Sequence, residues 1–416
     1  MRQSIFAIVI VAAFAGLVAL GAIGAIAHER GKGDVSVISI NDDNSGNFII
    51  KSDTLDLSAK WRGAFEISAD GRMIASANGR VEIARDKDGK RERAVFEGDG
   101  KSLKTSYFVN DRARAVDKTS EAEIGDLVLA FVRASGVNAD ERVADMLAKG
   151  GPDAVINEID AIEGGHAAMR YVIALSEQAQ LAPAQIDRLA GRIETFDGDH
   201  AKRRALETLF ERQKLTADSR ARLLKAAEGI SSDHDLRLLL ETVASGDMTK
   251  EAVETALALL GRISSDHDAR LAVEALIENP AFTDKDAARL LNAAAAQVGS
   301  DHDLRLALDA VAPRIANSDD VATAAIGALS DIESDHDCRL ALETIAESLP
   351  KGSPRWRALI EAVAEIGSDH DARVALEALA GLMPDDPSLV AAFRARANAI
   401  GSDHDRENAL AAIEGR

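Results

Sequence analysis

One short motif containing metal-binding and acid–base residues recurs through most of this chain. Its core is Asp-His-Asp, with an arginine two residues later, as in segment 335–339. The histidines of the series fall at positions 166, 200, 234, 267, 302, 336, 370 and 404, spaced by 33 to 35 residues. Imidazole and carboxylate groups both bind divalent cations, so the repeated triplet first suggests a row of metal sites.

The spacing of the triplet favours packing over metal binding. Consecutive residues of a helical turn point in different directions, so one triplet cannot easily chelate one ion. Stacked helices lie about 8–10 Å apart, too far for neighbouring histidines to share a metal. We therefore expect these rings to pack at repeat interfaces and expect no cofactor. The residual metal-ligand candidates are His234, His267, His302, His336, His370 and His404.

A proton sensor is the remaining interpretation of the same column. Histidine is the side chain whose charge ordinarily changes near physiological pH, and several copies would change charge together. The flanking aspartates favour protonation and the start of a helix opposes it. The balance of the two effects is left open.

The elements that must position these residues follow from the period. About 34 residues accommodate two helices and two turns, which predicts a mainly α protein built as an α-solenoid of HEAT-like hairpins. Segment 152–416 holds eight such repeats. In each motif a serine such as Ser300 is placed to cap the second helix, and Asp303, three residues later, would complete a capping box.

A second column combines arginine with carboxylates. Asp301, Arg305 and Asp309 are four residues apart and share one helical stripe. Each arginine thus lies between two carboxylates, and we expect it to reach a third on the adjacent repeat. An exposed partner-binding stripe is the alternative. The arginines of this column are Arg203, Arg237, Arg270, Arg305, Arg339 and Arg373.

The N-terminal part of the chain has a different character. Residues 5–27 lack charged side chains and are long enough to cross a bilayer, so segment 1–33 is predicted to be one transmembrane helix or an uncleaved signal. Cleavage after Ala27 is the alternative. Segment 34–115 predicts a small antiparallel β-domain of five to seven strands, with turns at Asp70-Gly71, Asn78-Gly79, Asp88-Gly89 and Asp99-Gly100. Segment 116–151 reads as a helical connector whose first helix is capped at Ser120.

Composition limits the partners. The net charge is −20, and segment 116–416 alone carries −22, because 1–33 carries +2 and 34–115 is neutral. An acidic solenoid repels nucleic acid and anionic lipid, whereas a basic protein remains a suitable partner. The single cysteine, Cys338, excludes an intramolecular disulfide, and the chain lacks HExxH, GxSxG and Walker motifs, so we expect no enzyme activity.

The recurring phrase Ile-Ser-Ser-Asp-His-Asp-x-Arg-x-x-Leu resembles a repeat of bacterial membrane-anchored proteins that usually carries Tyr in place of His. In such proteins a β-rich segment precedes the repeats, joined by a stretch similar to 142–155 here, and similar regions are appended to BlaR/MecR-type sensors. The resemblance covers about residues 34–416 and implies no biochemical activity, and the metallopeptidase portion of those sensors is absent.

These observations predict a non-enzymatic scaffold or sensor arm that binds a protein partner through the acidic solenoid, which suits a basic partner. We expect residues 5–27 to hold it in the bacterial inner membrane with its bulk in the periplasm, or cleavage at Ala27 to release it there. An ion- or pH-responsive sensor using the Asp-His-Asp column is the alternative function.

Overall fold

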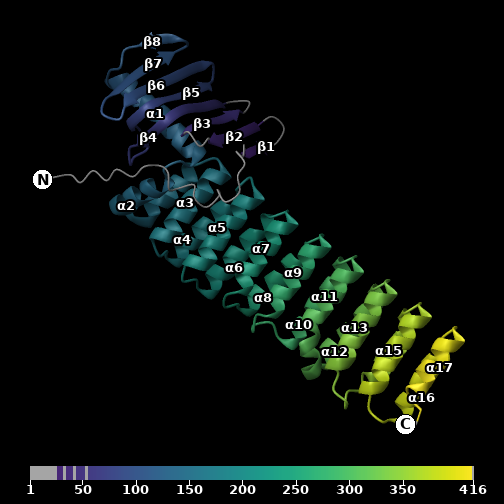
Figure 1. Ribbon diagram of the computed structural model, residues 1–416. Helices are drawn as coiled ribbons and strands as arrows, with labels where there is room; N and C mark the ends of the chain where they lie inside the picture. The colour runs from purple at the N-terminus through teal and green to yellow at the C-terminus, as the bar shows by residue number, and fades with distance from the viewer. Residues whose placement is uncertain (1–25, 31–33, 41–43, 52–54, 415–416) are drawn as a thin grey trace. The chain divides into compact units, whose positions relative to one another are not determined.

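The computed structural model describes residues 26–30, 34–40, 44–51 and 55–414 (Figure 1). The chain divides into two compact units, Met1–Lys214 and Leu215–Arg416. The first unit contains a β-sheet followed by helices, and the second contains helices throughout its described residues. The coarse prediction of a mainly helical protein with an N-terminal antiparallel sheet is confirmed.

The sheet of the first unit is an antiparallel meander in which each strand pairs with the next along the chain. Seven of its eight described strands lie within 34–115, where five to seven were predicted, and one precedes that segment. They are β1 Ile26–Arg30, β2 Asp34–Ile40, β3 Ser45–Lys51, β4 Leu55–Ile67, β5 Ile74–Lys87, β6 Lys90–Asp99, β7 Leu103–Val109 and β8 Arg112–Arg114.

Three of the four predicted turns lie between strands, and the fourth prediction is wrong. Asn78-Gly79 lies inside β5, where Gly79 pairs with Gly63 of β4. A Cβ atom on Gly79 would lie 2.0 Å from the carbonyl oxygen of Arg62, so the glycine serves close approach of two backbones. A two-residue sequence pattern cannot distinguish this use of glycine from a turn.

Helix α1, Lys118–Ser135, packs on one face of the sheet and completes its hydrophobic core. Phe131 of α1 meets Phe48 of β3 edge to face, with ring centroids 5.5 Å apart. The helix begins at Asp117, whose side chain accepts the amide N–H of Ser120, so the predicted cap at Ser120 lies three residues too late. The first part of the predicted connector is therefore a core element of the β-domain.

The described residues of the first unit form four more helices: α2 Ala139–Ala161, α3 Gly165–Gln178, α4 Pro183–Glu194 and α5 Asp199–Arg212. Helix α2 is interrupted at Gly151, which has φ of 67°, and continues from Pro152. The break falls where the sequence placed the boundary between the connector and the repeats, and proline is favoured at the first position of a helix.

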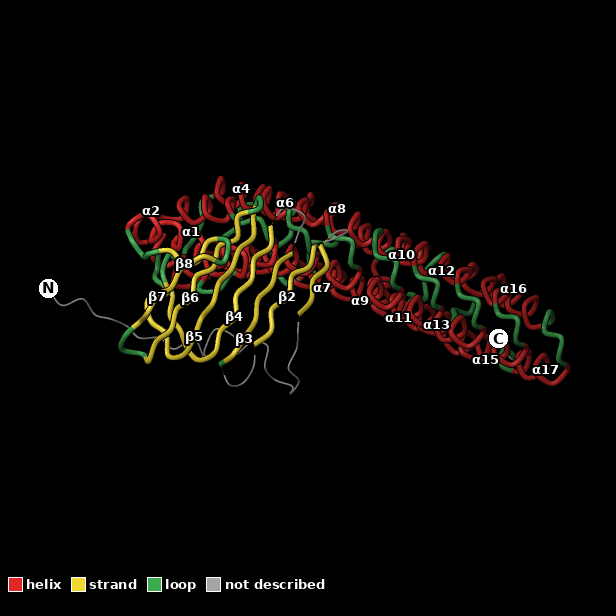
Figure 2. The backbone as a smooth tube through the Cα atoms, turned by 90° about the horizontal axis from the view of Figure 1, so that it is seen from above, coloured by secondary structure: helices red, strands yellow, loops and turns green. Residues whose placement is uncertain are grey.

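The second unit stacks its helices in two layers (Figure 2). Helices α7, α9, α11, α13, α15 and α17, each starting at the motif, form one layer, here called the motif layer. The helices of the unit are α6 Ala217–Ala226, α7 Asp233–Ala244, α8 Lys250–Leu260, α9 Asp266–Ile277, α10 Asp284–Gln297, α11 Asp301–Val311, α12 Asp319–Ala328, α13 Asp335–Ser348, α14 Trp356–Glu361, α15 Asp369–Leu382, α16 Pro387–Ala397 and α17 Asp403–Ala411, with short 3-10 segments η1 Ala227–Gly229, η2 Ala312–Asn317, η3 Leu329–Asp331 and η4 Ala362–Glu365.

Most of the predicted membrane segment lies outside the described residues. Its last two residues, Ile26 and Ala27, belong to β1, so the sheet begins earlier than position 34, where the sequence placed it. Within the described ranges, every helix is too short or too polar to cross a bilayer.

Candidate functional site

Each helix of the motif layer begins at the serine of its motif, as predicted. The serine hydroxyl accepts the amide N–H of the aspartate three residues later at 3.2–3.3 Å. This bond satisfies one of the free N–H groups at the start of a helix. The six capping residues are Ser232, Ser265, Ser300, Ser334, Ser368 and Ser402.

The second bond of the predicted capping box is made by a different residue. The amide N–H of Ser334 donates to Asp301 of the preceding repeat at 2.7 Å, rather than to Asp337 of its own helix. Ser265 bonds Asp233 at 2.8 Å, and Ser402 bonds Asp369 at 2.8 Å, in the same way. The first aspartate of one motif therefore closes the cap of the next repeat.

The arginine of the motif joins three groups. In α11, Arg305 Nε donates to Asp337 Oδ1 of the next motif helix at 3.0 Å, and its Nη1 donates to Asp309 Oδ2 at 2.7 Å. Its Nη2 lies 3.3 Å from Nδ1 of His302. Four further arginines make the same three contacts: Arg237, Arg270, Arg339 and Arg373.

These contacts place the predicted arginine column at the seam between repeats. In the first unit, Arg203 bonds Glu207 and His200. The aspartate four residues before each arginine was expected to share in the pair, but in α11 that residue, Asp301, bonds the next loop instead. The third carboxylate lies on the adjacent repeat, where the sequence placed it.

We call the arginine–carboxylate contacts made by Arg237, Arg270, Arg305, Arg339 and Arg373 the ladder. The ladder affects the pKa values of aspartates that take part in it. Burial raises the pKa of Asp337, but the hydrogen bonds from Ser334 and Arg305 outweigh this effect and hold the pKa below its usual value. The pKa values of Asp268 and Asp371 are lowered in the same way. The fold thus stabilises the ionised form of these carboxyls.

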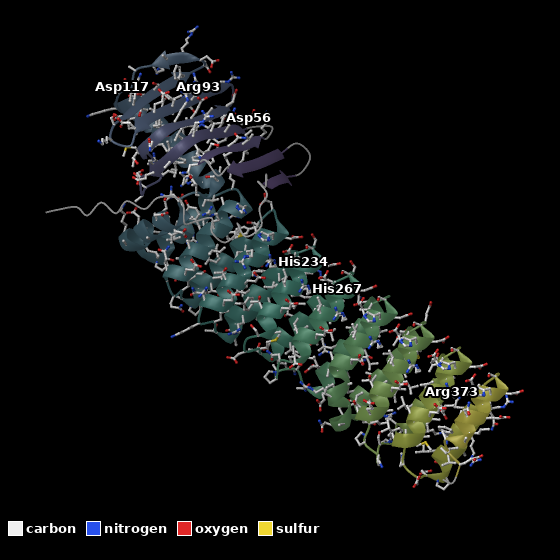
Figure 3. All side chains as sticks on the ribbon, viewed as in Figure 1. Asp56, Arg93, Asp117, His234, His267 and Arg373 are labelled. Carbon is white, nitrogen blue, oxygen red and sulfur yellow. The ribbon has the colours of Figure 1, made fainter. Side chains whose placement is uncertain are left out.

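The histidines do not pack between repeats, so that expectation is wrong. All six rings from His234 to His404 are exposed, and the side chains of His234 and His302 are each 64% exposed. Figure 3 shows His234 and His267 at matching places on α7 and α9. Because a guanidinium can only donate, Nδ1 of His302 accepts from Arg305 when the ring is neutral with its proton on Nε2.

The same contacts bear on metal binding. Each Nδ1 from His234 to His370 already faces an arginine, and His404 contacts Asn408 through Nε2. Within the described ranges, no cluster of three or more histidine, cysteine or acidic side chains has the arrangement to hold an ion. The six candidate histidines are thus placed singly, one at the start of each motif helix.

A row of aliphatic residues on the motif layer was not predicted from the sequence. Leu306 follows Arg305, lies four residues after His302 and three before Asp309, and is therefore on the same face as both. The equivalent side chains are all partly exposed, while the next two positions of each helix are buried. We call them the aliphatic row: Leu238, Leu271, Leu306, Leu340 and Val374. The recurring residue after each arginine was the signal available for finding it.

A separate polar cluster lies in the first unit. Arg142, with only 4% of its side chain exposed, donates to Glu158 at 2.7 Å and to the backbone oxygen of Asp70 at 3.2 Å. Gly71 leaves room for it, since a Cβ there would lie 1.9 Å from Nη1. Arg133 also binds Glu158. The cluster fastens the β4–β5 turn to α2.

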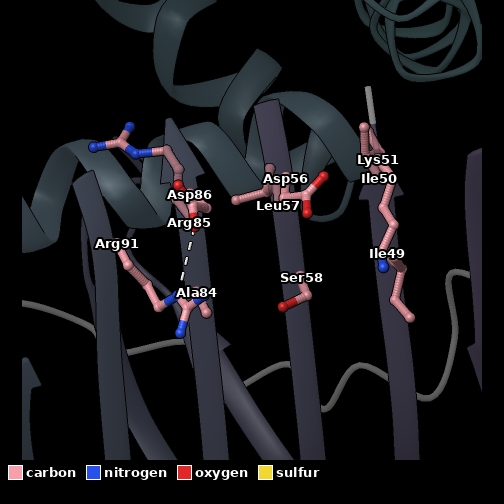
Figure 4. Close-up of a pocket in the computed structure, with 10 residues that line it drawn as sticks. All are labelled: Ile49, Ile50, Lys51, Asp56, Leu57, Ser58, Ala84, Arg85, Asp86 and Arg91. Atoms are coloured by element: carbon pink, nitrogen blue, oxygen red, sulfur yellow. Dashed lines mark ion pairs between the residues drawn. The ribbon is translucent and has the colours of Figure 1, made fainter. Parts of the chain in front are cut away.

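A small pocket lies on strands β3 to β6 (Figure 4). Its volume is about 170 Å³, below the range of about 300–1,000 Å³ typical of ligand pockets. Arg91 Nε faces Asp86 Oδ2 at 3.5 Å within it, so these charges are directed at each other. The pocket therefore offers little as a substrate site.

Comparison with known proteins adds little to this geometry. No protein-family model matches the chain, and no curated protein matches it. One solved structure that it resembles is described as "Computational Design of Self-Assembling Cyclic Protein Homooligomers", with 18% identity over 68% of this chain and 90% of the other and a TM-score of 0.14. At that score the likeness carries no inference.

Proposed function

We propose that this protein is a non-enzymatic scaffold or sensor arm that binds a protein partner through the acidic surface of its repeats. The observation that carries the proposal is repetition: α7, α9, α11, α13 and α15 each present an exposed histidine with a partly exposed aliphatic residue and a partly exposed acid, in register. A repeated surface unit suits an extended partner, whereas catalysis needs one constellation at one place.

The charge of the second unit indicates the chemistry of the partner. Residues 215–416 include 36 acidic and 20 basic residues, a net charge of −16. The guanidiniums of the ladder are already bonded to carboxylates of their own and the next repeat. A basic protein is favoured by this balance, and nucleic acid is disfavoured.

The proposal includes a tether to the bacterial inner membrane, with the bulk of the chain in the periplasm. Residues 5–25 would span the hydrocarbon core, since about 20 apolar residues suffice. Release after cleavage at Ala27 is the alternative, and it would remove the first two residues of β1.

Capture by the full-length protein tests the function. Purified protein on beads is incubated with bacterial membrane extract, and bound proteins are identified by mass spectrometry at low and high salt. We expect one basic protein to elute with salt and to be lost with the double variant Glu343→Gln, Glu377→Gln. The matched control, Glu251→Gln with Glu361→Gln, changes exposed acids of the other layer. Equal capture by both double variants would contradict the proposal.

A pH-responsive sensor remains a second candidate because of one specific contact. Nδ1 of His302 can accept from Arg305 only while the ring is neutral, and protonation sets two donors against each other. Asp337 of α13, 3.8 Å from Nδ1, opposes this effect, as do Asp301 and Asp303 beside the ring. If the candidate is right, acidification lowers urea stability less in a triple variant of His267, His302 and His336 to Gln than in the wild type. Equal losses in both proteins would exclude it.

A further inference from the structure

We propose that the aliphatic row is a docking track for an extended basic segment that carries an apolar side chain at every third residue. The inference rests on the proposed function and names the partner chemistry of that surface. The row is built from one partly exposed residue on each of five successive motif helices. Equivalent positions in α5 and α17 hold Arg204 and Asn408, so the apolar track has five positions.

The exposed charge beside the row is negative. In the five ladders the arginine side chains are only 13–18% exposed, while the acids that they bond within the same helix are 24–38% exposed. A ligand on this face therefore meets carboxylate oxygens before guanidinium groups. Cationic side chains on either side of an apolar one would be attracted, and anionic ones would be repelled.

Small side chains lie next to these acids, one turn after the aliphatic residue in each helix. The position four residues after each aliphatic residue is also partly exposed and holds only threonine or alanine, as in Ala310 and Thr344. Small residues there leave space for the backbone of a ligand to approach the helices. The face thus offers an apolar strip with carboxylates and small side chains along the same edge.

Helix spacing selects the conformation of the segment. Neighbouring packed helices lie about 8–10 Å apart. A polyproline II segment turns once in three residues and rises about 9 Å, so every third side chain would meet a new position of the row. In a β-strand, residues three apart point to opposite faces. An α-helix would instead need an apolar residue about every seventh position.

Binding of designed peptides to the full-length protein tests the track. The first peptide has five Leu-Lys-Pro units, the second the same composition in scrambled order, and the third is an alanine-based helical peptide with leucine at every seventh position and the same number of lysines. We expect the periodic Leu-Lys-Pro peptide to bind tightest by fluorescence anisotropy, with an affinity that falls as salt is raised.

Two substitutions of equal charge locate the binding site. Leu306→Lys lies in the middle of the row, and Ala258→Lys lies at an exposed position of α8 in the other layer. We expect Leu306→Lys to weaken binding about tenfold or more and Ala258→Lys to leave it within about twofold. If Leu306→Lys does not fold, the double variant Leu306→Gln, Leu340→Gln takes its place, with circular dichroism as the check.

Equal binding of the ordered and scrambled peptides, tighter binding of the helical peptide, or equal effects of the two lysine variants would overturn the inference. None of these results removes the proposed function, which depends on capture of a cellular protein. If that protein is captured and Leu306→Lys binds it as well as the wild type, the function stands and the track is wrong.

Discussion

At the scale of single residues, the arginine of each motif belongs to the seam between repeats. Arg305 is 15% exposed and Asp337 is 17% exposed, so water screens their attraction only in part. Desolvating both groups costs free energy, and the several hydrogen bonds of the guanidinium offset that cost. Removing the arginine alone should therefore lower the free energy of unfolding by more than the ion pair contributes to it, because the carboxylates stay partly buried without their cation.

Replacing Arg305 with alanine should lower the free energy of unfolding by about 2–4 kcal/mol, because Asp309 and Asp337 lose their shared cation. Arg357, which pairs with Glu361 at an exposed site, is the matched control, and Arg357→Ala should cost less than about 1 kcal/mol. Urea denaturation followed by circular dichroism measures both. Similar losses in the two variants would mean that the ladder is no more than a surface ion pair.

The exposed histidine leads to a different expectation. His302→Ala removes a ring that lies mostly in solvent, so it should cost less than about 1 kcal/mol. Leu308 of the same helix is fully buried, and Leu308→Ala should cost about 2–5 kcal/mol because it leaves a cavity. Thermal melts of the two variants give the comparison. A large loss for His302→Ala would show that the ring is packed after all.

At the scale of elements, the start of each motif helix is shared between two repeats. Asp301 accepts the amide N–H groups of Glu333 and Ser334 from the next loop, at 3.1 and 2.7 Å. One helix thus completes the cap of the next, which couples their stability. Nearest-neighbour coupling of this kind makes adjacent repeats unfold together.

The last motif provides the control for this coupling. Asp403 holds the place of Asp301 in α17, is 85% exposed and pairs with Arg406 of its own helix. Asp301→Ala should lower stability by about 1–2 kcal/mol and Asp403→Ala by less than about 0.5 kcal/mol. Hydrogen exchange should also show faster exchange at Glu333 and Ser334 in Asp301→Ala. Equal behaviour of the two variants would contradict capping across repeats.

The loss of stability at low pH depends on the aspartates of the ladder. Because the pKa of Asp337 lies below its ordinary value of 3.8, its ionised form adds stability above that pH, and this stability is lost as pH falls through the folded pKa. Asp337→Asn should therefore be less stable than the wild type at pH 6 and should lose less stability between about pH 5 and 2. Asp331→Asn, at an exposed site, should follow the wild type. Parallel curves for Asp337→Asn and the wild type would refute the pKa shift.

Features set by residues close together in the sequence were predicted correctly. Contacts that depend on the offset between neighbouring helices were not predicted. The serine caps depend on residues a few positions apart, and they were placed correctly. The partner of Ser334 lies 33 residues away, and the 34-residue period alone does not give the offset between neighbouring helices. The exposure of His302 and the packing of α1 on the sheet depend on tertiary structure for the same reason.

At the scale of the whole molecule, charge and repetition are concentrated in one part. The second unit carries −16 of the total charge of −20, and it contains the ladder, the exposed histidines and the aliphatic row. The first unit uses its buried charges internally, as in the Arg142 cluster. This distribution of charge supports our proposal that a basic partner binds the repeats.

Site-specific photo-cross-linking in cells tests that central claim most directly. A cross-linking amino acid is placed at Ala275 or Ala310, beside the aliphatic row, or at Ala258 or Thr323, exposed on the other layer. We predict that positions 275 and 310 yield the same cross-linked protein and that positions 258 and 323 yield none. Cross-links that are equal from both layers, or that come only from positions 258 and 323, would contradict a partner-binding face on the motif layer.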